Sequence, residues 1–287
     1  MNLVPGFVSR VVERVQYGKR PNNATPMDWN KCFPPHRVVG NVYYVGSSFI
    51  ASFLIATSEG HFLLNSGTEE TVSLIRSGIE ELGFRFADIK ILLSGHAHID
   101  HVGGHQLIRQ LTGARVMAMD GDDMLISSGG AADFHYADRW KWTGCPVDHI
   151  LHDGEIVTLG GVSLTAHLTP GHTEGCTTWA FTTEDRGRPC RVVVVASARA
   201  NPGYRLVNNP KYPGIVADFE RTFRVLSSLS CDVFLGAHGW YYGLESKFAA
   251  LSKAETNPFM DPQGYRDFLE RSEKAFRVEL ARQRDKR

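Results

Sequence analysis

The sequence predicts a layered α/β fold, built as one domain over residues 31–287 that follows an N-terminal extension over residues 1–30. Short apolar stretches rich in Val, Ile and Leu occur in two runs, and longer amphipathic stretches separate them, which favours sheets layered with helices. The chain has 287 residues, 43% of them hydrophobic, which is enough for one sizeable core. No internal repeat or low-complexity segment divides it.

Each predicted strand is a short apolar or β-branched run bounded by polar or glycine-rich residues. In chain order, strands are expected at residues 42–46, 51–56, 62–65, 89–93, 115–119, 149–151, 155–159, 162–167, 177–181, 191–196 and 233–236. The predicted helices carry apolar residues at helical spacing, and Gly83 and Gly113 are placed to end the first two. Helices are expected at residues 70–82, 103–111, 212–229, 244–251 and 262–282.

The N-terminal extension has apolar residues at helical spacing from Leu3 to Val15, with Arg10, Glu13 and Arg14 on the opposite face. We expect an amphipathic helix that packs on its own domain or on a second subunit, so a homo-oligomer is possible. A membrane-surface helix, or a trimmed mature form that restarts at Met1, is the alternative. The extension has no signal-peptide core, and no apolar run approaches the roughly 20 residues of a membrane span.

The composition argues against nucleic-acid binding and against a fold held by disulfides. The chain has 31 Lys and Arg against 31 Asp and Glu, so no basic patch suggests nucleic-acid binding. Its five cysteines are odd in number, widely spaced and form no C-x-x-C, which argues against a disulfide framework.

A dense group of metal-binding residue types follows the predicted strand at 89–93. His96, His98, Asp100 and His101 form an H-x-H-x-D-H cluster between that strand and a helix. Two later apolar runs end just before His172 and His238. Neutral imidazole and carboxylate are the ligands of zinc sites that keep a position open for water. We therefore predict a two-zinc site, since one turn cannot supply enough ligands for a metal pair.

The other histidines are expected in packing or surface positions, since a lone histidine is more often packed than ligating. His105 follows His101 by one helical turn and is the one expected nearest the site. The remaining members of this group are His36, His61, His135, His149, His152 and His167.

The H-x-H-x-D-H cluster, the Pro170-Gly171-His172-Thr173 segment and the strand-terminal His238 together resemble the metallo-β-lactamase superfamily. The resemblance runs through residues 31–287 and implies a four-layer αβ/βα sandwich, in which two mixed β-sheets are flanked by helices. It also implies two Zn²⁺ ions per chain. The first would be held by His96, His98 and His172, and the second by Asp100, His101 and His238.

One position distinguishes groups within the superfamily. Many members, such as glyoxalase II, place a metal-bridging Asp at the end of the strand predicted at 191–196, and first-subclass β-lactamases place a Cys ligand there. This chain has Ser197 there and keeps His101, which resembles the third subclass of class B β-lactamases. The local segments 40–46, 167–179 and 201–204 agree with that subclass.

This resemblance implies a zinc-dependent β-lactamase that hydrolyses the amide bond of penicillins, cephalosporins and carbapenems with a metal-bridging hydroxide. Asp100 would orient the hydroxide, although pure ligation is its alternative role. Tyr204 would donate to the developing oxyanion or serve only in packing. Ser197, Tyr204 and Trp240 would contact substrate. Arg199 would pair with the substrate carboxylate, or would lie on the surface and leave that contact missing. A dizinc hydrolase of another lactone, ester or thioester, or a scaffold with a vestigial site, are the competing functions.

Further expectations concern residues around the site. Asn65 replaces an aspartate that supports the metal turn in many members, which would lower metal affinity. The segment with Phe134, Tyr136, Trp140 and Trp142 would form either a lid or core, and Trp240, Tyr241 and Tyr242 would wall the pocket. The family implies periplasmic export, although no signal peptide is recognised. A partner for Cys231 is missing from residues 261–265, so that cysteine should be free.

Overall fold

The computed structural model describes residues 29–137 and 139–285; the helix predicted near the N-terminus lies outside them. The strands are β1 (His36–Val39), β2 (Val42–Tyr44), β3 (Phe53–Thr57), β4 (Gly60–Leu64), β5 (Ile89–Leu93), β6 (Arg115–Met119), β7 (His149–Leu151), β8 (Glu155–Leu159), β9 (Val162–Leu168), β10 (Thr177–Asp185), β11 (Arg188–Val195) and β12 (Val233–Gly236). The helices are α3 (Val72–Glu81), α4 (Ile99–Val102), α5 (His105–Thr112), α6 (Asp123–Ser127), α7 (Ile215–Ser228), α8 (Gly239–Tyr242), α9 (Leu244–Leu251) and α10 (Pro262–Arg284), with a 3₁₀ turn at Phe86–Asp88.

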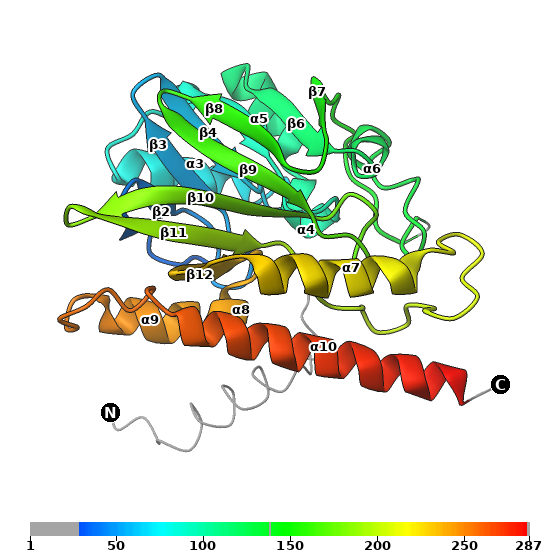
Figure 1. The fold of residues 1–287 in the computed structure, drawn as a ribbon. Coiled ribbons are helices and arrows are strands. Elements are labelled where there is room, and N and C mark those ends of the chain that lie inside the picture. Colours follow the sequence, from blue (N-terminus) through cyan, green and yellow to red (C-terminus); the bar gives the residue numbers. More distant parts are fainter. Residues whose placement is uncertain (1–28, 138, 286–287) are drawn as a thin grey trace, which may run out of the picture.

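Two mixed sheets face each other, as Figure 1 shows. The first has the order β1-β2-β3-β4-β5-β6-β7, antiparallel as far as β4 and parallel from β4 to β7. The second has the order β12-β11-β10-β9-β8, with only the β11–β12 pair parallel. The predicted α/β sandwich with two mixed sheets and flanking helices is confirmed.

The central strands of the first sheet, such as β3, are buried on both faces, because their alternate side chains enter two different cores. Phe53 and Ile55 of β3 enter the large core that the two sheets share. Leu54, between them, enters a second core beneath α3 and α5. On the other side of the sandwich, α7 and α10 pack on each other near β12 through aromatic residues such as Phe219 and Phe276, whose ring centroids are 4.9 Å apart.

Three differences from the predicted elements have local causes. β1 and α6 were not predicted, because each is only four or five residues long. The β10–β11 hairpin extends past the predicted strands to the pair Asp185–Arg188. Its tip is polar, and Arg186 and Gly187 both have positive φ, which is the backbone of a type I′ turn.

The helix predicted at 103–111 begins only at His105, as α5, and a separate short helix that was not predicted, α4, precedes it, with Gly103 and Gly104 between the two. A Cβ on Gly104 would lie 2.9 Å from the carbonyl oxygen of Ser66 and 2.5 Å from Val72 Cγ2. The chain therefore passes against the turn after β4 at this point. This contact fixes the depth of α4, which carries Asp100 and His101.

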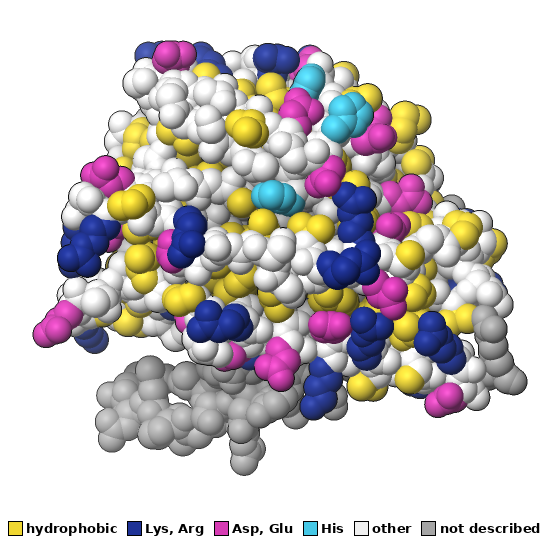
Figure 2. All heavy atoms as spheres, in the orientation of Figure 1, with side chains coloured by type: hydrophobic (Ala, Val, Ile, Leu, Met, Phe, Trp, Pro, Cys, Tyr) yellow, Lys and Arg dark blue, Asp and Glu magenta, His cyan; other side chains and the backbone are white. Residues whose placement is uncertain are grey.

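Figure 2 shows lysine, arginine and acidic side chains interspersed over the face made by the second sheet, α7 and α10. Within residues 29–137 and 139–285, no helix has both the length and the apolar character needed to cross a membrane. All five cysteines, Cys231 included, are free thiols.

Candidate metal centre

The predicted ligands meet where strands of both sheets end. The metal turn (residues 94–101) leaves β5 and continues into α4. His172 lies in the loop between β9 and β10, and His238 immediately precedes α8. A β-bridge between Ile50 and His238 joins the two sheets at this edge. The fold therefore brings three distant segments to one place.

His96, His98 and His172, here called the first ligand set, form a buried cluster of imidazoles. Their potential ligand nitrogens all lie within 4.8 Å of one another. Ring centroids are 4.8 Å apart for His96 and His98, and 4.4 Å apart for His96 and His172. Three neutral imidazoles converging in this way are a donor set that zinc accepts.

Asp100, His101 and His238, here called the second ligand set, adjoin the first. Asp100 Oδ2 lies 3.3 Å from His101 Nε2 and 3.8 Å from His238 Nε2. The ligand atoms of His96, Asp100 and His101 also lie within 4.8 Å of one another. The structure thus brings all six predicted ligand side chains together, as one continuous cluster.

Several of these imidazole nitrogens are buried without a hydrogen-bond partner. They are Nδ1 of His96 and both ring nitrogens of His101. A buried polar nitrogen with no partner is costly, so such groups normally have one. A cation between the rings would supply that partner. The donor chemistry of the cluster therefore fits a divalent metal.

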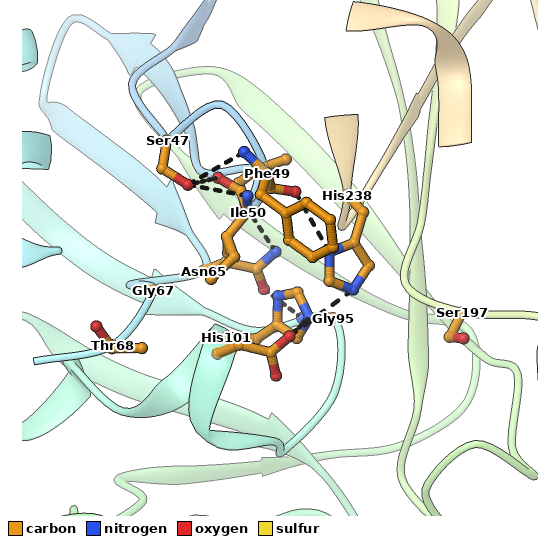
Figure 3. A network of polar contacts seen from close by, with 12 residues as sticks. Ser47, Phe49, Ile50, Asn65, Gly67, Thr68, Gly95, His101, Ser197 and His238 are labelled. Atoms are coloured by element: carbon orange, nitrogen blue, oxygen red, sulfur yellow. Dashed lines mark hydrogen bonds and ion pairs between the residues drawn. The ribbon is translucent and has the colours of Figure 1, made fainter. Parts of the chain in front are cut away.

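Backbone carbonyls fix the tautomers of two candidate ligands. His172 Nδ1 lies 2.7 Å from the carbonyl oxygen of Arg199, and His238 Nδ1 lies 3.3 Å from that of Phe49. A carbonyl oxygen only accepts, so each Nδ1 must carry the proton and donate. Each Nε2 is then left with its lone pair, which is the form that binds a metal. Figure 3 shows His238 against the Phe49–Ile50 turn.

Two buried carboxylates support the first ligand set, and the sequence analysis did not single out either. Asp133 Oδ2 lies 3.3 Å from His98 Nε2, without the alignment of a hydrogen bond, while its Oδ1 accepts the backbone N–H of His135. Asp122 accepts the backbone N–H of Ala97. Asp122 follows the pair Asp120-Gly121, a turn signal that comes directly after the strand predicted at 115–119 and could have pointed to it. Asp133 stands in a loop without one.

Neutral groups support the metal turn and the second ligand set. Asn65 Oδ1 accepts the N–H of Gly95 at 2.9 Å, and Asn65 Nδ2 donates to the carbonyl of Ala51 at 3.2 Å. Figure 3 shows Asn65 between these two segments. Ser66 Oγ donates to the carbonyl of His101 and contacts His105 Nδ1 at 2.7 Å. His105 thus lies near the site, in a supporting position.

Burial and neighbouring charge set the protonation of these groups. Burial, aided by the adjacent imidazoles, holds the pKa of His96 well below its usual value, so this ring is neutral. Burial lowers the pKa of His105 to about 3. Burial acts to raise the pKa of Asp100, but the neighbouring His101 imidazole outweighs it and the pKa is lowered. A neutral His96 imidazole and an ionised Asp100 carboxylate are in the protonation states in which these residue types ligate metals.

The predicted substrate residues lie around the cluster in different ways. Arg199, Trp240 and Tyr241 line the same small pocket as the ligands, and the Arg199 guanidinium lies 4.9 Å from the centre of the Trp240 ring. Ser197 is buried beside it, with its Oγ 3.4 Å from the Tyr241 hydroxyl. Tyr242, expected at the pocket wall, instead packs in the large core, because α8 turns it away from the ligands.

Tyr204 is only 2% exposed, and its hydroxyl donates to the carbonyl oxygen of His172 at 2.8 Å. The hydroxyl thus supports the backbone of a candidate ligand. Its ring packs against Phe134, with centroids 4.9 Å apart. The oxyanion role stays a prediction.

The aromatic segment from Phe134 to Trp142, predicted to form either a lid or part of the core, has residues in different surroundings. Phe134 packs on the large core, whereas Trp140 stacks against Trp29, with centroids 5.3 Å apart. Trp29, Trp140 and Trp142 line a groove of about 460 Å³. The same three residues line an adjoining pocket that reaches His98 and Asp100. The groove therefore leads away from the ligand cluster.

Comparison with known proteins agrees with this geometry. Residues 45–183 match the family model of the metallo-beta-lactamase superfamily. The native FEZ-1 metallo-beta-lactamase of Legionella gormanii is 48% identical over 89% of this chain and 98% of that one, with a TM-score of 0.88. BJP-1, a subclass B3 metallo-beta-lactamase of Bradyrhizobium japonicum, is 35% identical over 91% and 99% of the two chains, with a TM-score of 0.85.

Curated relatives match over a shorter stretch. A hydroxyacylglutathione hydrolase of Fuscovulum blasticum is 34% identical over 101 residues, which are 35% of this chain and 31% of that protein. The chain spans about a third of the length of the curated relatives it matches. The full-length agreement in sequence and fold is with the solved structures. The chain belongs to the metallo-β-lactamase superfamily, and its structural neighbours there are metallo-β-lactamases of subclass B3.

Proposed function

We propose that this protein hydrolyses the amide bond of β-lactams at a centre of two zinc ions. The observation that carries the proposal is the convergence of all six candidate ligands. Position 197, where many superfamily members have a metal-bridging Asp, is a serine in this chain. The likeness to FEZ-1, a metallo-beta-lactamase, extends over nearly the whole of both chains and supports the same substrate class.

When bound, zinc supplies Lewis-acid chemistry, because it polarises a carbonyl and lowers the pKa of water to about 7. The first ligand set would hold one ion and the second ligand set the other. Asp100 stays ionised, so one carboxyl oxygen can ligate while the other accepts a hydrogen bond from the attacking water and orients it. His172 and His238 keep their lone pairs directed at the site through their backbone partners.

Arg199 is the cationic group placed to bind the carboxylate that β-lactams carry. Its guanidinium lies over Trp240 within the pocket of the ligands. A charge-assisted bond to a carboxylate contributes roughly 1.5–3 kcal/mol, so we expect Arg199→Ala to raise KM by about 10-fold or more. The groove of Trp29, Trp140 and Trp142 would accept an apolar substituent of the substrate.

Turnover of a chromogenic cephalosporin by the purified, zinc-loaded protein tests the proposal. We expect hydrolysis that a chelator abolishes and added zinc restores, together with two zinc ions per chain by elemental analysis. Absence of turnover for penicillins, cephalosporins and carbapenems by protein that holds two zinc ions would refute it.

A dizinc hydrolase of another lactone, ester or thioester is the second candidate. The partial match to a hydroxyacylglutathione hydrolase, 34% identical over 101 residues, favours it. Ser197 argues against it, because such enzymes place an acid there. A glutathione thioester assayed beside the cephalosporin separates the two: the second candidate requires the thioester to be the better substrate.

A further inference from the structure

Asp122 lies outside the pocket and is not a member of either ligand set, yet its side chain is almost fully buried, with 1% of the residue exposed. It accepts three hydrogen bonds. Its Oδ2 accepts the backbone N–H of Ala97 at 2.7 Å and the hydroxyl of Thr173 at 3.0 Å. Its Oδ1 accepts the backbone N–H of Gly175 at 3.0 Å. A buried carboxylate with this many donors is held firmly in one place.

The donors come from two segments that the chain keeps far apart. Ala97 lies between His96 and His98, whereas Thr173 directly follows His172. One carboxylate therefore ties together the two pieces of backbone that carry the entire first ligand set. Asp100 and His101 of the second ligand set follow Ala97 in the metal turn, but no member of that set is a sequence neighbour of Thr173 or Gly175.

The backbone around Asp122 leaves no room for rearrangement. A Cβ on Gly175 would lie 2.4 Å from the backbone nitrogen of Asp122, and a Cβ on Gly121 would lie 3.0 Å from the backbone nitrogen of Gly175. The two turns thus pack backbone against backbone. The distance between His172 and the metal turn is then set largely by this contact and by the carboxylate inside it.

We propose that Asp122 is a positioning residue that sets the zinc affinity of the first ligand set by fixing His172 relative to His96 and His98. This inference rests on the proposed metal centre. Asp122→Asn keeps the size of the side chain but turns one acceptor into a donor that faces other donors. Groups that orient ligands typically contribute 10–100-fold to metal affinity.

The test measures zinc dissociation constants by competition with a chromophoric chelator, in backgrounds that retain one ligand set. In His238→Ala, where the first ligand set remains, we expect Asp122→Asn to weaken zinc binding by about 10–100-fold. In His172→Ala, where the second ligand set remains, the same change should leave the zinc affinity within about 3-fold of its starting value.

Asp123→Asn is the matched control, because Asp123 is the adjacent acid and accepts only the N–H of Gly121, at 3.2 Å. It should leave both constants unchanged. Thr173→Val removes one of the three donors while retaining the fold, and it should weaken the first ligand set less than Asp122→Asn does. Thr173→Val also carries the test if Asp122→Asn does not fold.

Unchanged zinc constants in both variants would overturn the proposal. Equal weakening of both ligand sets would also overturn it, since that marks general loss of structure. If the wild type binds zinc but hydrolyses no β-lactam, the proposed substrate fails and this inference stands. If the wild type binds no zinc at all, both fail together.

Discussion

The two ligand sets lie side by side, yet the groups that support them differ in charge. Buried carboxylates support the first set: Asp122 holds its backbone and Asp133 faces His98. Neutral groups support the second set, namely Ser66 at His101 and the carbonyl of Phe49 at His238. A carboxylate partner makes an imidazole a stronger ligand than a carbonyl partner does.

The identity of the ligands alone therefore does not determine which of the two sites binds zinc more tightly. Asp100 brings one negative charge to the second set, and two carboxylates lie behind the first. We therefore expect the first ligand set to fill before the second when zinc is limiting. Substitutions can reverse or strengthen this order.

The largest effect is expected from loss of a ligand. His172→Ala should remove zinc from the first ligand set and lower kcat/KM by about 10³-fold or more, because a Lewis acid contributes several kcal/mol to the transition state. His238→Ala should cost less, since the better supported set remains. Zinc content and cephalosporin kinetics of both variants check this. A normal metal content and rate in His172→Ala would refute the assignment.

Asp133→Asn tests the supporting charge directly. The amide can keep the oxygen that accepts the N–H of His135 while it removes the charge 3.3 Å from His98. We expect zinc at the first ligand set to bind about 10–100-fold more weakly. Asp120→Asn, at an exposed neighbouring strand end, is the control. Equal zinc affinities in the two variants would show that the charge of Asp133 does not support zinc binding at the first ligand set.

The ligand cluster could be predicted from the sequence because its chemistry is local. Four metal-binding residue types stand within six positions, and His172 and His238 each follow an apolar run. Short apolar runs bounded by polar or glycine-rich residues likewise placed most strands. These features need no knowledge of the partners across the fold.

The supporting residues could not be predicted in the same way. Asp122 contacts Thr173 across 51 positions of chain, and Asp133 contacts His98 from a loop with no repeating pattern. Such contacts depend on how two turns pack, which periodicity does not encode. The interruption between α4 and α5 has the same origin, because it follows from the contact of Gly104 with the turn at Ser66.

Asn65→Asp tests whether an added negative charge strengthens zinc binding at the second ligand set. The carboxylate can still accept the N–H of Gly95 and adds a negative charge behind the metal turn, which carries Asp100 and His101 of the second ligand set. We expect zinc there to bind about 10-fold more tightly. The bond from Asn65 to the Ala51 carbonyl is lost, at a cost of about 1 kcal/mol in unfolding free energy. Zinc titration and thermal unfolding measure the two effects. Unchanged affinity would show that charge behind this set is immaterial.

Tyr204→Phe has the smallest expected effect and separates two roles for one hydroxyl. In the structure this hydroxyl donates to the carbonyl of His172, so its removal should cost about 1 kcal/mol of stability. If support of His172 is its main role, kcat should fall by less than about 10-fold and zinc affinity should fall with it. If the hydroxyl instead donates to the oxyanion, kcat should fall by about 10²–10³-fold with zinc affinity unchanged. Because the hydroxyl proton is already committed to a buried carbonyl, we expect the first result.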